Sequence, residues 1–471
     1  MSTFTVTNTN NSGAGSLRQA VLNANALSGK DIINFGGLFT DGLAHTISLT
    51  GSGLSITDDL IIVGTNPSKL TIKDDSADRV FDITSGVTSA INGLTITNTY
   101  NSYNGTPGGG GISNEGVLTL NNSVITGNIV YHNARDLDGN TIGAGGGIYN
   151  AGSLTVNYST ISNNSATDVF YESSYGGGIY STGSLTVKCS NITGNTSGYE
   201  GGGIFSEQSL KTGINSNSIF VNYSTITNNS AAESGGGIFS VGGTVNYSTI
   251  NNNSARGAGG GIYLLEGTMS HSTISGNFAP IGGGIFSVGG TVSYSTISDN
   301  SVYSDSDGIG GGIFSVGGTV SYSTISGNFA GNGGGIYAES NVIISHSTIS
   351  GNSAHFGGGG IYAESNVIIS HSTISGNQAH FGGGIYNNGI LTVGNSTIRH
   401  NRAFGIELSS GAKESGEGGG IYNYSADYTT ATLNYSTIAC NFDTPEEDSN
   451  KFIKLDNLVG KFINIGSVVR V

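Results

Sequence analysis

The acidic side chains are the first groups in this chain that could catalyse a reaction. Cleavage of an acidic polysaccharide needs carboxylates gathered with Lys or Arg in one groove, for proton transfer or for holding a metal ion. Here the expected strands carry almost no charge, and the acids stand singly in loops. We therefore predict no catalytic residue, no metal site and no cofactor. The isolated acids are Asp168, Glu172, Glu200, Glu207 and Glu233.

Histidine is suited to acid–base catalysis near neutral pH, and three histidines share one position of a sequence repeat. These are His271, His346 and His371, and other copies of the repeat carry Tyr at the same position. A position that accepts either residue type is a poor place for a catalytic base. The tyrosines at this position are Tyr158, Tyr223, Tyr247, Tyr294 and Tyr322.

A second repeated position holds Tyr or Phe directly after the sequence Gly-Gly-Gly-Ile. In an alternating strand this side chain faces out of the core. A file of outward rings could stack on sugar rings or on a partner protein; alternatively, the rings stack on one another and stiffen the sheet. The candidate binding residues are Tyr149, Tyr180, Phe205, Phe239, Tyr263, Phe286, Phe314, Tyr337, Tyr362 and Tyr386, and Tyr422 follows the same pattern.

Threonine recurs at a third position, usually followed two residues later by Ser or Thr. Such columns would form a flat outward lattice that resembles β-helical ice-binding proteins, although Ser at the second position departs from their pattern. Threonine is also a favourable residue for a solvent-facing strand. The second set of candidate binding residues is Thr160, Thr225, Thr249, Thr273, Thr296, Thr324, Thr348 and Thr373.

Composition excludes several partners. The 471 residues include 31 Asp and Glu against 16 Lys and Arg, and no basic cluster is present. Binding to nucleic acid or to anionic lipid is therefore not expected. No apolar stretch is long enough to span a bilayer. The 80 glycines come in clusters rather than at every third position, which excludes collagen.

A sequence unit recurs twelve times and dominates the chain. Each copy begins Gly-Gly-Gly-Ile and later carries Ser-x-Ile-x-x-Asn, and the commonest spacing is 23 to 25 residues. The first isoleucine of each copy is residue 112, 148, 179, 204, 238, 262, 285, 313, 336, 361, 385 or 421.

Each copy shows an alternation of period two, which predicts three short strands separated by Gly and Asn corners. Leu154 and Val156 point to one side of a strand and Thr155 points to the other. One copy then closes a triangular coil, and the next coil stacks on it at about 4.8 Å. Because parallel crossovers are nearly always right-handed, we predict an all-β fold, a right-handed parallel β-helix with three sheets.

Two polar columns are expected to set the register between coils. Serine stands two residues before the second isoleucine in all twelve copies, from Ser123 to Ser436, and should face inward. Asparagine stands three residues after it, where its amide can donate to one neighbouring coil and accept from the other. This structural ladder comprises Asn128, Asn164, Asn195, Asn229, Asn253, Asn277, Asn300, Asn328, Asn352, Asn377, Asn401 and Asn441.

Three regions follow from the repeat. We expect residues 1–110 to form an N-terminal cap and non-consensus coils, residues 111–442 the twelve-repeat β-helix, and residues 443–471 a C-terminal cap or tail. Within the first region, Leu17, Val21 and Ala24 have helical spacing. A short helix there could cover the open first coil.

The repeated motifs resemble the GGA[I/L/V] and FxxN repeats of polymorphic outer-membrane proteins, with Ile in place of Phe. The opening segment Gly15-Ser16-Leu17-Arg18-Gln19-Ala20, with Asp31-Ile32-Ile33-Asn34-Phe35, resembles the CSLREA-type start of bacterial β-helix proteins. The resemblance implies export, surface display and often adhesion. The resemblance to the repeats of polymorphic outer-membrane proteins covers roughly residues 105–445. This chain lacks the terminal outer-membrane barrel that such proteins use as an anchor.

The sequence therefore predicts a non-enzymatic, secreted or surface-displayed structural or adhesive element. Its expected partners are a glycan or a cell-surface protein, and self-association remains open. The N-terminus has no classical signal peptide, so the export route is not indicated. Two alternatives remain. One is a polysaccharide lyase or hydrolase with an acidic cluster built from loops 129–144, 165–175 and 405–417; the other is an ice-binding protein.

Overall fold

The structure is a computed structural model of the whole chain. It describes all residues except 77, 99–100, 104–107, 133–143, 169–173, 208–218, 303–307, 408–412, 425–428, 444–453, 456 and 471. The chain divides into two compact units, Met1–Thr249 (the N-terminal unit) and Ile250–Val471 (the C-terminal unit). Each unit is described by itself.

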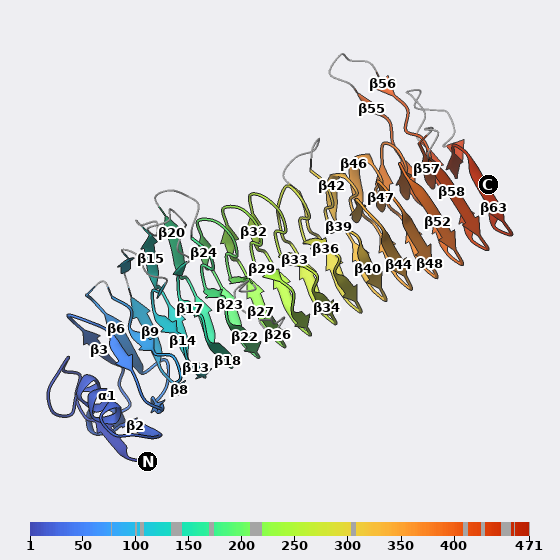
Figure 1. Cartoon of the computed structure of the whole chain (residues 1–471). Helices are drawn as coiled ribbons and strands as arrows, with labels where there is room; N and C mark the ends of the chain where they lie inside the picture. The colour runs from blue at the N-terminus through green and yellow to red at the C-terminus, as the bar shows by residue number, and fades with distance from the viewer. Residues whose placement is uncertain are drawn as a thin grey trace, which may run out of the picture. The chain divides into compact units, whose positions relative to one another are not determined.

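The N-terminal unit is a stack of coils in which strands of successive coils pair in parallel (Figure 1). In the repeats, the strands of the first sheet begin at the Gly-Gly-Gly-Ile isoleucine, and equivalent residues pair directly, as Ile148 with Ile179. Its strands are β4 (Leu54–Ile56), β7 (Phe81–Ile83), β12 (Ile112–Asn114), β17 (Ile148–Asn150), β21 (Ile179–Ser181), β25 (Ile204–Ser206) and β29 (Ile238–Val241). The non-consensus strands β4 and β7 continue this sheet toward the N-terminus.

The second and third sheets of this unit follow the Leu-Thr-Val and Ser-Thr-Ile elements. The second sheet contains β1 (Thr3–Val6), β2 (Asp31–Phe35), β5 (Leu60–Val63), β8 (Thr88–Asn92), β13 (Val117–Asn121), β18 (Ser153–Asn157), β22 (Ser184–Lys188), β26 (Ile219–Asn222) and β30 (Thr244–Asn246). The third contains β3 (His45–Leu49), β6 (Leu70–Asp74), β9 (Thr95–Asn98), β14 (Val124–Thr126), β19 (Thr160–Ser162), β23 (Asn191–Thr193) and β27 (Thr225–Thr227), and β31 (Thr249–Asn251) lies at the division between units.

The C-terminal unit repeats this arrangement. Its first sheet contains β33 (Ile262–Leu265), β36 (Ile285–Val288), β39 (Ile313–Val316), β43 (Ile336–Ala338), β47 (Ile361–Ala363), β51 (Ile385–Asn387), β57 (Ile421–Asn423) and β62 (Leu458–Val459). Its second contains β34 (Thr268–Ser270), β37 (Thr291–Ser293), β40 (Gly318–Ser321), β44 (Val342–Ser345), β48 (Val367–Ser370), β52 (Ile390–Gly394), β58 (Thr430–Asn434) and β63 (Phe462–Ile465). Its third contains β35 (Thr273–Ser275), β38 (Thr296–Ser298), β41 (Thr324–Ser326), β45 (Thr348–Ser350), β49 (Thr373–Ser375), β53 (Thr397–Arg399), β59 (Thr437–Ala439) and β64 (Val468–Arg470).

A further short strand follows the ladder asparagine in many coils, and sequence reasoning missed it because it is only two to five residues long. In the N-terminal unit these strands are β10 (Asn101–Tyr103), β15 (Ile129–His132), β20 (Ser165–Asp168), β24 (Thr196–Ser197) and β28 (Ser230–Ala231). In the C-terminal unit they are β32 (Ser254–Ala255), β42 (Phe329–Asn332), β46 (Ser353–Gly357), β50 (Gln378–Ala379), β54 (Arg402–Ala403) and β60 (Phe442–Asp443). The predicted three-sheet parallel β-helix is confirmed in each unit, with this addition.

The Gly-Gly-Gly sequence is required by close backbone contacts between coils. Gly235 has φ +68°, a left-handed conformation that favours glycine. A Cβ on Gly202 would lie 2.4 Å from the carbonyl oxygen of Gly236 in the next coil. The following isoleucine then enters the core, and both Ile204 and Ile238 are fully buried. The glycines let the coils approach closely enough for the isoleucines to pile up in a column.

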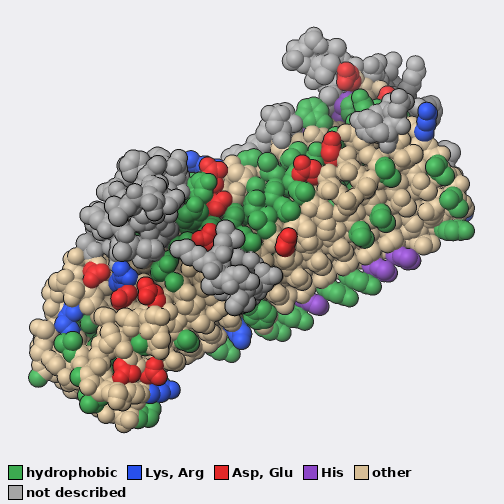
Figure 2. All heavy atoms as spheres, viewed as in Figure 1, with side chains coloured by type: hydrophobic (Ala, Val, Ile, Leu, Met, Phe, Trp, Pro, Cys, Tyr) green, Lys and Arg blue, Asp and Glu red, His purple; other side chains and the backbone are tan. Residues whose placement is uncertain are grey.

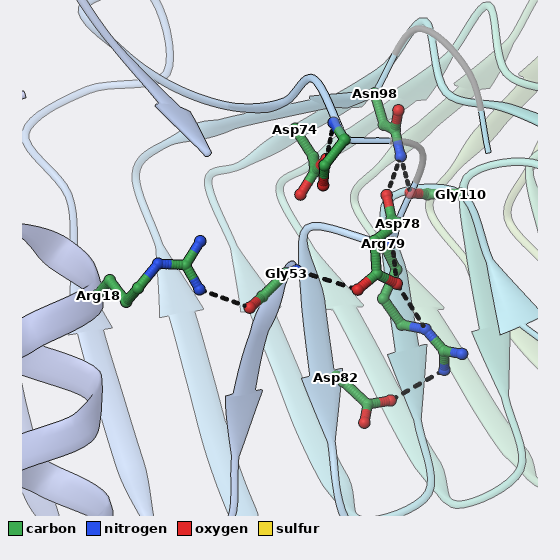
Figure 3. Close-up of polar contacts among 9 residues, drawn as sticks. Arg18, Gly53, Asp74, Asp78, Arg79, Asp82, Asn98 and Gly110 are labelled. Carbon is green, nitrogen blue, oxygen red and sulfur yellow. Dashed lines mark hydrogen bonds and ion pairs between the residues drawn. The ribbon is translucent and has the colours of Figure 1, made fainter. Parts of the chain in front are cut away.

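The predicted N-terminal helix is present as α1 (Leu17–Asn25) and closes the first coils. Ser16 caps the helix, and its hydroxyl accepts a 3.2 Å hydrogen bond from the backbone N–H of Gln19. Leu17 and Val21 are buried against the coils. Arg18 donates a 3.0 Å hydrogen bond to the carbonyl of Gly53 (Figure 3). The Ser-Leu-Arg sequence thus supplies a cap, a core contact and a tie to β4.

The non-consensus coils place polar residues where the repeats carry the ladder asparagine. Asp74 and Asn98 stand two residues after Ile72 and Ile96, and both are fully buried. Asn98 donates a 3.1 Å hydrogen bond to the carbonyl of Gly110 (Figure 3). Burial raises the pKa of the Asp74 carboxyl above its ordinary value.

The C-terminal segment that loses the sequence repeat still forms one more coil. β62, β63 and β64 pair in parallel with β57, β58 and β59. Asn457 accepts a 2.8 Å hydrogen bond from the amide of Asn441. Sequence reasoning missed Asn457 because Gly-Gly-Gly-Ile is absent from this coil.

Candidate functional site

The asparagine column forms a continuous hydrogen-bonded ladder within each unit. In the C-terminal unit the Asn300 amide donates 3.0 Å hydrogen bonds to Asn328 Oδ1 and to the carbonyl of Ile274. Its own Oδ1 accepts from the backbone N–H and the amide of Asn277. Asn164 and Asn195 in the N-terminal unit are joined in the same way, at 2.9 Å. Because these amides are buried, the column is structural and is not exposed to a ligand.

The serine column is also buried and internally bonded. The Ser295 hydroxyl donates to the carbonyl of Ser293 at 2.7 Å and accepts the backbone N–H of Ser272 at 3.1 Å. Each serine therefore ties its own corner and the preceding coil together. Neither polar column leaves a group available for catalysis.

The Tyr and Phe residues after Gly-Gly-Gly-Ile stack on one another along each unit, and we call them the inner aromatic column. In the C-terminal unit the centroids of neighbouring rings are separated by 4.4 Å between Tyr263 and Phe286 and by 4.8 Å between Tyr337 and Tyr362. In the N-terminal unit Tyr180 and Phe205 are buried, with Tyr175 packed against them. Tyr149, Tyr180, Phe205 and Phe314 are buried, whereas the other rings of the column are half-buried.

Carboxylates border this column, and they come from a repeated position that the sequence analysis did not single out. Three residues after the first isoleucine lie Glu115, Glu207, Glu339 and Glu364. The Tyr180 hydroxyl donates to Glu207 at 2.7 Å, and the Tyr337 hydroxyl donates to Glu364 at 3.1 Å. Each bond joins a ring to the glutamate of the next coil.

The prediction that the acids stand singly is wrong for three of them. Stacking of coils brings Glu200, Glu207 and Glu233 together, although they are separated in sequence. Burial, and then the charges of Glu207 and Glu233, raise the pKa of Glu200 to about 7. Glu172 lies outside the described residues, as does the side chain of Asp168. Much of the three loops proposed to build an acidic groove, 133–143, 169–173 and 408–412, also lies outside them.

The exposed aromatic surface is a different column, at the corner before Ser-Thr-Ile, and we call it the corner ridge. In the C-terminal unit it contains His271, Tyr294, Tyr322, His346 and His371. Tyr294 is 52% exposed and Tyr322 is 48% exposed. Hydrophobic and histidine side chains project in a row along the lower edge of the molecule in Figure 2. The N-terminal unit carries Tyr158, Tyr223 and Tyr247 at the same corner.

Rings of the corner ridge lie parallel but do not fully cover one another. The centroids of His271 and Tyr294 are 4.9 Å apart, and those of Tyr322 and His346 are 4.6 Å apart. Atoms in van der Waals contact lie about 3.5–4.0 Å apart, and the ring centroids are farther apart than this. Part of each ring face, and the polar edge of each ring, is therefore open to solvent. Such a surface offers apolar contact and hydrogen bonding on five successive coils of the C-terminal unit, from His271 to His371.

The backbone at this corner makes bulky residues costly. Tyr294, Tyr322 and His346 have φ of 49° to 50°, in the left-handed region. A residue with a Cβ pays about 1–2 kcal/mol there, and only Gly, Asn and Asp adopt it routinely. The next corner of the same coils has the same conformation and carries Asp299, Gly327 and Gly351. Across the twelve repeats the first corner carries a ring in nine copies and Asn122, Cys189 or Asn395 in the others, whereas the second carries Gly, Asn or Asp in ten copies and His400 or Cys440 in the others. The two corners share a conformation but differ in their predominant residue type, so the backbone alone does not select the rings.

The sequence signal for the ridge is the alternation of Tyr and His at one repeated position, the same alternation that disfavours a catalytic base there. The alternation of Tyr and His at one position preserves a planar ring with a polar atom, which is a shared property of both residues. The contrast between a ring at one corner and Gly, Asn or Asp at the next was also visible. That both corners are left-handed required the structure.

The threonine columns are in register, as the lattice expectation requires. Thr273 pairs with Thr296, Thr324 with Thr348, and Ser298 with Ser326. Several of these threonines are exposed, whereas Thr160 and Thr225 in the N-terminal unit are half-buried. The strands β35, β38, β41, β45 and β49 all read Thr-Ile-Ser, so they carry no charged residue.

Among the described residues, no three or more His, Cys, Asp or Glu side chains are placed to hold a metal ion. In the same part of the chain, no helix is long and apolar enough to cross a membrane. Cys189 and Cys440 are both exposed and free.

Comparisons with known proteins agree with the motifs. A family model of the right-handed β-helix region matches residues 268–434. The Chlamydia polymorphic membrane protein repeat matches residues 158–182 and 223–241. The resemblance drawn from the motifs is confirmed. No curated protein matches the chain in sequence.

Three solved structures align with much of this chain at low identity and low TM-score. The A-module of a mannuronan C-5 epimerase from Azotobacter vinelandii is 12% identical, with a TM-score of 0.28 and 99% of each chain covered. The Agl-KA catalytic domain is 16% identical, with a TM-score of 0.35, 96% of this chain and 64% of that one. A mannuronic acid-specific family 6 polysaccharide lyase from human gut microbiota is 11% identical, with a TM-score of 0.28, 84% of this chain and 87% of that one.

Proposed function

We propose that this protein is a non-enzymatic, surface-displayed β-helix that adheres to an extended, uncharged polysaccharide through the corner ridge. The observation that carries the proposal is the exposed ring held in left-handed backbone at coil after coil. A conformation that costs stability and recurs at an exposed position supports a role in contact with a ligand. The resemblance to polymorphic membrane protein repeats supports display at a cell surface.

Charge and periodicity favour this class of partner. The chain has a formal net charge of −15, so an anionic polysaccharide or a second copy of the chain is repelled at low ionic strength. The ridge itself presents Tyr hydroxyls and His nitrogens, which can bond sugar hydroxyls. A ring on each of five successive coils, from His271 to His371, gives several equivalent weak contacts, which suits a ligand that is itself a repeating chain.

Affinity electrophoresis of the full chain tests the proposal. The gels contain hydroxyethyl cellulose as the neutral polymer or sodium alginate as the acidic one. We expect retardation by the neutral polymer only. In a variant carrying Tyr294→Asn, Tyr322→Asn and His346→Asn, the apparent affinity should fall at least about tenfold, because each ring contact contributes about 0.5–1.5 kcal/mol.

The matched control replaces Thr296, Thr324 and Thr348 by Ala on the same coils. These threonines lie on the third sheet beside the ridge, and their loss should leave retardation unchanged. Equal binding by the ridge variant and the native chain, or retardation by alginate alone, would overturn the proposal.

The enzymatic alternative makes a different prediction. A polysaccharide lyase or hydrolase would release reducing or unsaturated ends from one of the polymers, and Glu200, whose pKa is raised to about 7, is the candidate acid to test. If the native chain depolymerises one of the polymers and Glu200→Gln abolishes this activity, the adhesive proposal is wrong and the protein is an enzyme.

The ice-binding alternative rests on the threonine columns. It predicts thermal hysteresis by the native chain and loss of hysteresis in the threonine variant, with no effect of the ridge variant. This pattern would also contradict the adhesive role of the ridge.

A further inference from the structure

The C-terminal unit contains a pocket where the inner aromatic column meets an insertion. The antiparallel pair β55 (Ile406–Glu407) and β56 (Lys413–Glu414) interrupts the repeat between Ile398 and Ile438. In Figure 1 these strands project from the side of the coils. A cavity of about 370 Å³ lies at their foot, and its lining consists of Phe381, Glu414, Ser415, Glu417 and Tyr422.

Two rings form the apolar walls of this pocket. The centroids of Phe381 and Tyr422 are 5.2 Å apart, and their planes meet at 44°, so the rings make a corner instead of a closed stack. Tyr422 continues the inner aromatic column from Tyr386, at 5.3 Å. The faces of aromatic rings attract cations.

Two carboxylates form the polar walls. Glu414 comes from β56, and Glu417 lies on the exposed edge of the next Gly-Gly-Gly corner. Among the described residues of the C-terminal unit, no Lys or Arg forms an ion pair with either carboxylate. The pKa of Tyr422 is raised by burial and then by the charge of Glu417. The pocket therefore brings two carboxylates and two aromatic walls together.

A buried histidine lies beside the Glu414 carboxylate. The side chain of His380 is 1% exposed, and its Nδ1 lies 2.8 Å from the carbonyl oxygen of Phe404. Because a carbonyl only accepts, Nδ1 carries a proton. Nε2 has no hydrogen-bond partner and lies 3.6 Å from Oε2 of Glu414. At this distance a protonated ring pairs with the carboxylate, and a neutral ring offers Nε2 as an acceptor next to it.

We propose that this pocket binds the primary ammonium group of an alkylamine. A tetrahedral –NH₃⁺ group has three donors and no acceptor, and the carboxylates of Glu414 and Glu417 line the pocket, with Nε2 of His380 3.6 Å behind Glu414. Phe381 and Tyr422 contact the alkyl chain and the face of the charge. A carboxylate ligand is repelled, and a neutral alcohol lacks the charge that these walls select. This inference is independent of the adhesive role of the corner ridge.

Titration with n-butylammonium chloride tests the proposal on the full chain. The readouts are the ring nitrogen shifts of His380 by NMR and the affinity by calorimetry. We expect saturable binding, with a shift at His380 Nε2, and no response to n-butanol or to sodium chloride at equal concentration. Glu414→Gln and Glu417→Gln keep the shape of the side chain and remove its charge, so each should weaken binding at least about tenfold.

The matched controls are Glu339→Gln and Glu364→Gln, which remove carboxylates bordering the same aromatic column outside the pocket. They should leave the butylammonium affinity within about twofold of the native value. Glu414 is half-exposed, so its variant is expected to fold and is decisive if the Glu417 variant does not. Absence of saturable binding, equal binding of n-butanol, or full affinity in Glu414→Gln would overturn the proposal.

Discussion

The ring of Tyr294 lies parallel to the ring of Tyr322 in the next coil, with centroids 4.8 Å apart and planes 6° apart. Both residues hold a left-handed backbone, with φ of 50° and 49°. The stacking contributes about 0.5–1.5 kcal/mol, and the conformation costs about 1–2 kcal/mol. At this corner the two effects nearly cancel, so stability alone does not explain an aromatic residue.

Replacing Tyr294 by Asn should therefore leave stability almost unchanged. Asparagine adopts the left-handed conformation readily, and the strain it relieves offsets the lost ring contacts. We expect the thermal unfolding midpoint to stay within about 2 °C of the native value, while binding to hydroxyethyl cellulose weakens. Tyr294→Val is the comparison, because a β-branched residue keeps the strain and loses the stacking. If the Asn variant unfolds as early as the Val variant, the strain argument is wrong.

Removal of a ladder asparagine should be far more harmful. Asn300→Ala leaves the buried backbone N–H of Asn277 without its acceptor and removes the amide bonds to Asn328 and to the carbonyl of Ile274, while the backbone N–H of residue 300 still donates to Asn328 Oδ1. An unsatisfied buried group costs about 1–3 kcal/mol and each further lost hydrogen bond about 0.5–1.5 kcal/mol, so we expect a loss of at least about 2 kcal/mol in urea denaturation. The control is Thr296→Ala on the same coil, which should change stability by no more than about 0.5 kcal/mol.

Alanine at the third glycine of a Gly-Gly-Gly corner should separate two coils. A Cβ on Gly284 would lie 2.6 Å from the carbonyl oxygen of Gly312, and backbone cannot move aside without breaking the ladder. We expect Gly284→Ala to lose about 3 kcal/mol in the same assay. Gly351→Ala is matched, since its Cβ would meet nothing within 4 Å and only its φ of +64° is unfavourable. If both variants lose the same free energy of unfolding, the positive φ of the glycine backbone, and not the close approach of neighbouring coils, would explain why glycine is required.

The glutamate cluster of the N-terminal unit should make stability depend on pH. The pKa of Glu200 is about 7 in the folded protein, against an ordinary value of 4.5. The folded chain therefore keeps a proton that the unfolded chain releases, and stability falls as pH rises from about 4.5 to about 7. Glu200→Gln should raise the unfolding temperature at pH 8 and change it little at pH 4. A variant that is destabilised equally at both pH values would contradict this origin.

Much of the fold follows from local pattern, because each coil repeats the same alternation of apolar and polar residues at the same spacing. The alternation of Leu154, Thr155 and Val156 places apolar residues on one side, and the regular spacing stacks them in columns. The helix at Leu17–Asn25 was also readable, since Ser16 and the spacing of Leu17 and Val21 are local signals. The extra coil at Leu458–Arg470 was not readable, because its strands pair through backbone atoms and lack the glycine signature.

The candidate sites were predicted less well, because exposure and proximity between coils are not local properties. Tyr180 and Phe205 alternate as outward residues, yet neighbouring rings cover them. Tyr294 occupies a corner, where alternation makes no prediction, and it is half-exposed. Glu200 and Glu233 are 33 positions apart and lie within electrostatic reach through stacking.

By itself, the sequence determined the coil, its strands and its polar ladders, since these depend on which residues recur at a fixed spacing and on the burial of apolar side chains. Only the tertiary structure decided which aromatic column is more exposed and which carboxylates interact electrostatically. It also decided that Nε2 of His380 lies 3.6 Å from Oε2 of Glu414. The reason is physical. Hydrophobic periodicity is a property of one strand, whereas accessibility and electrostatic potential depend on every chain segment that surrounds a side chain.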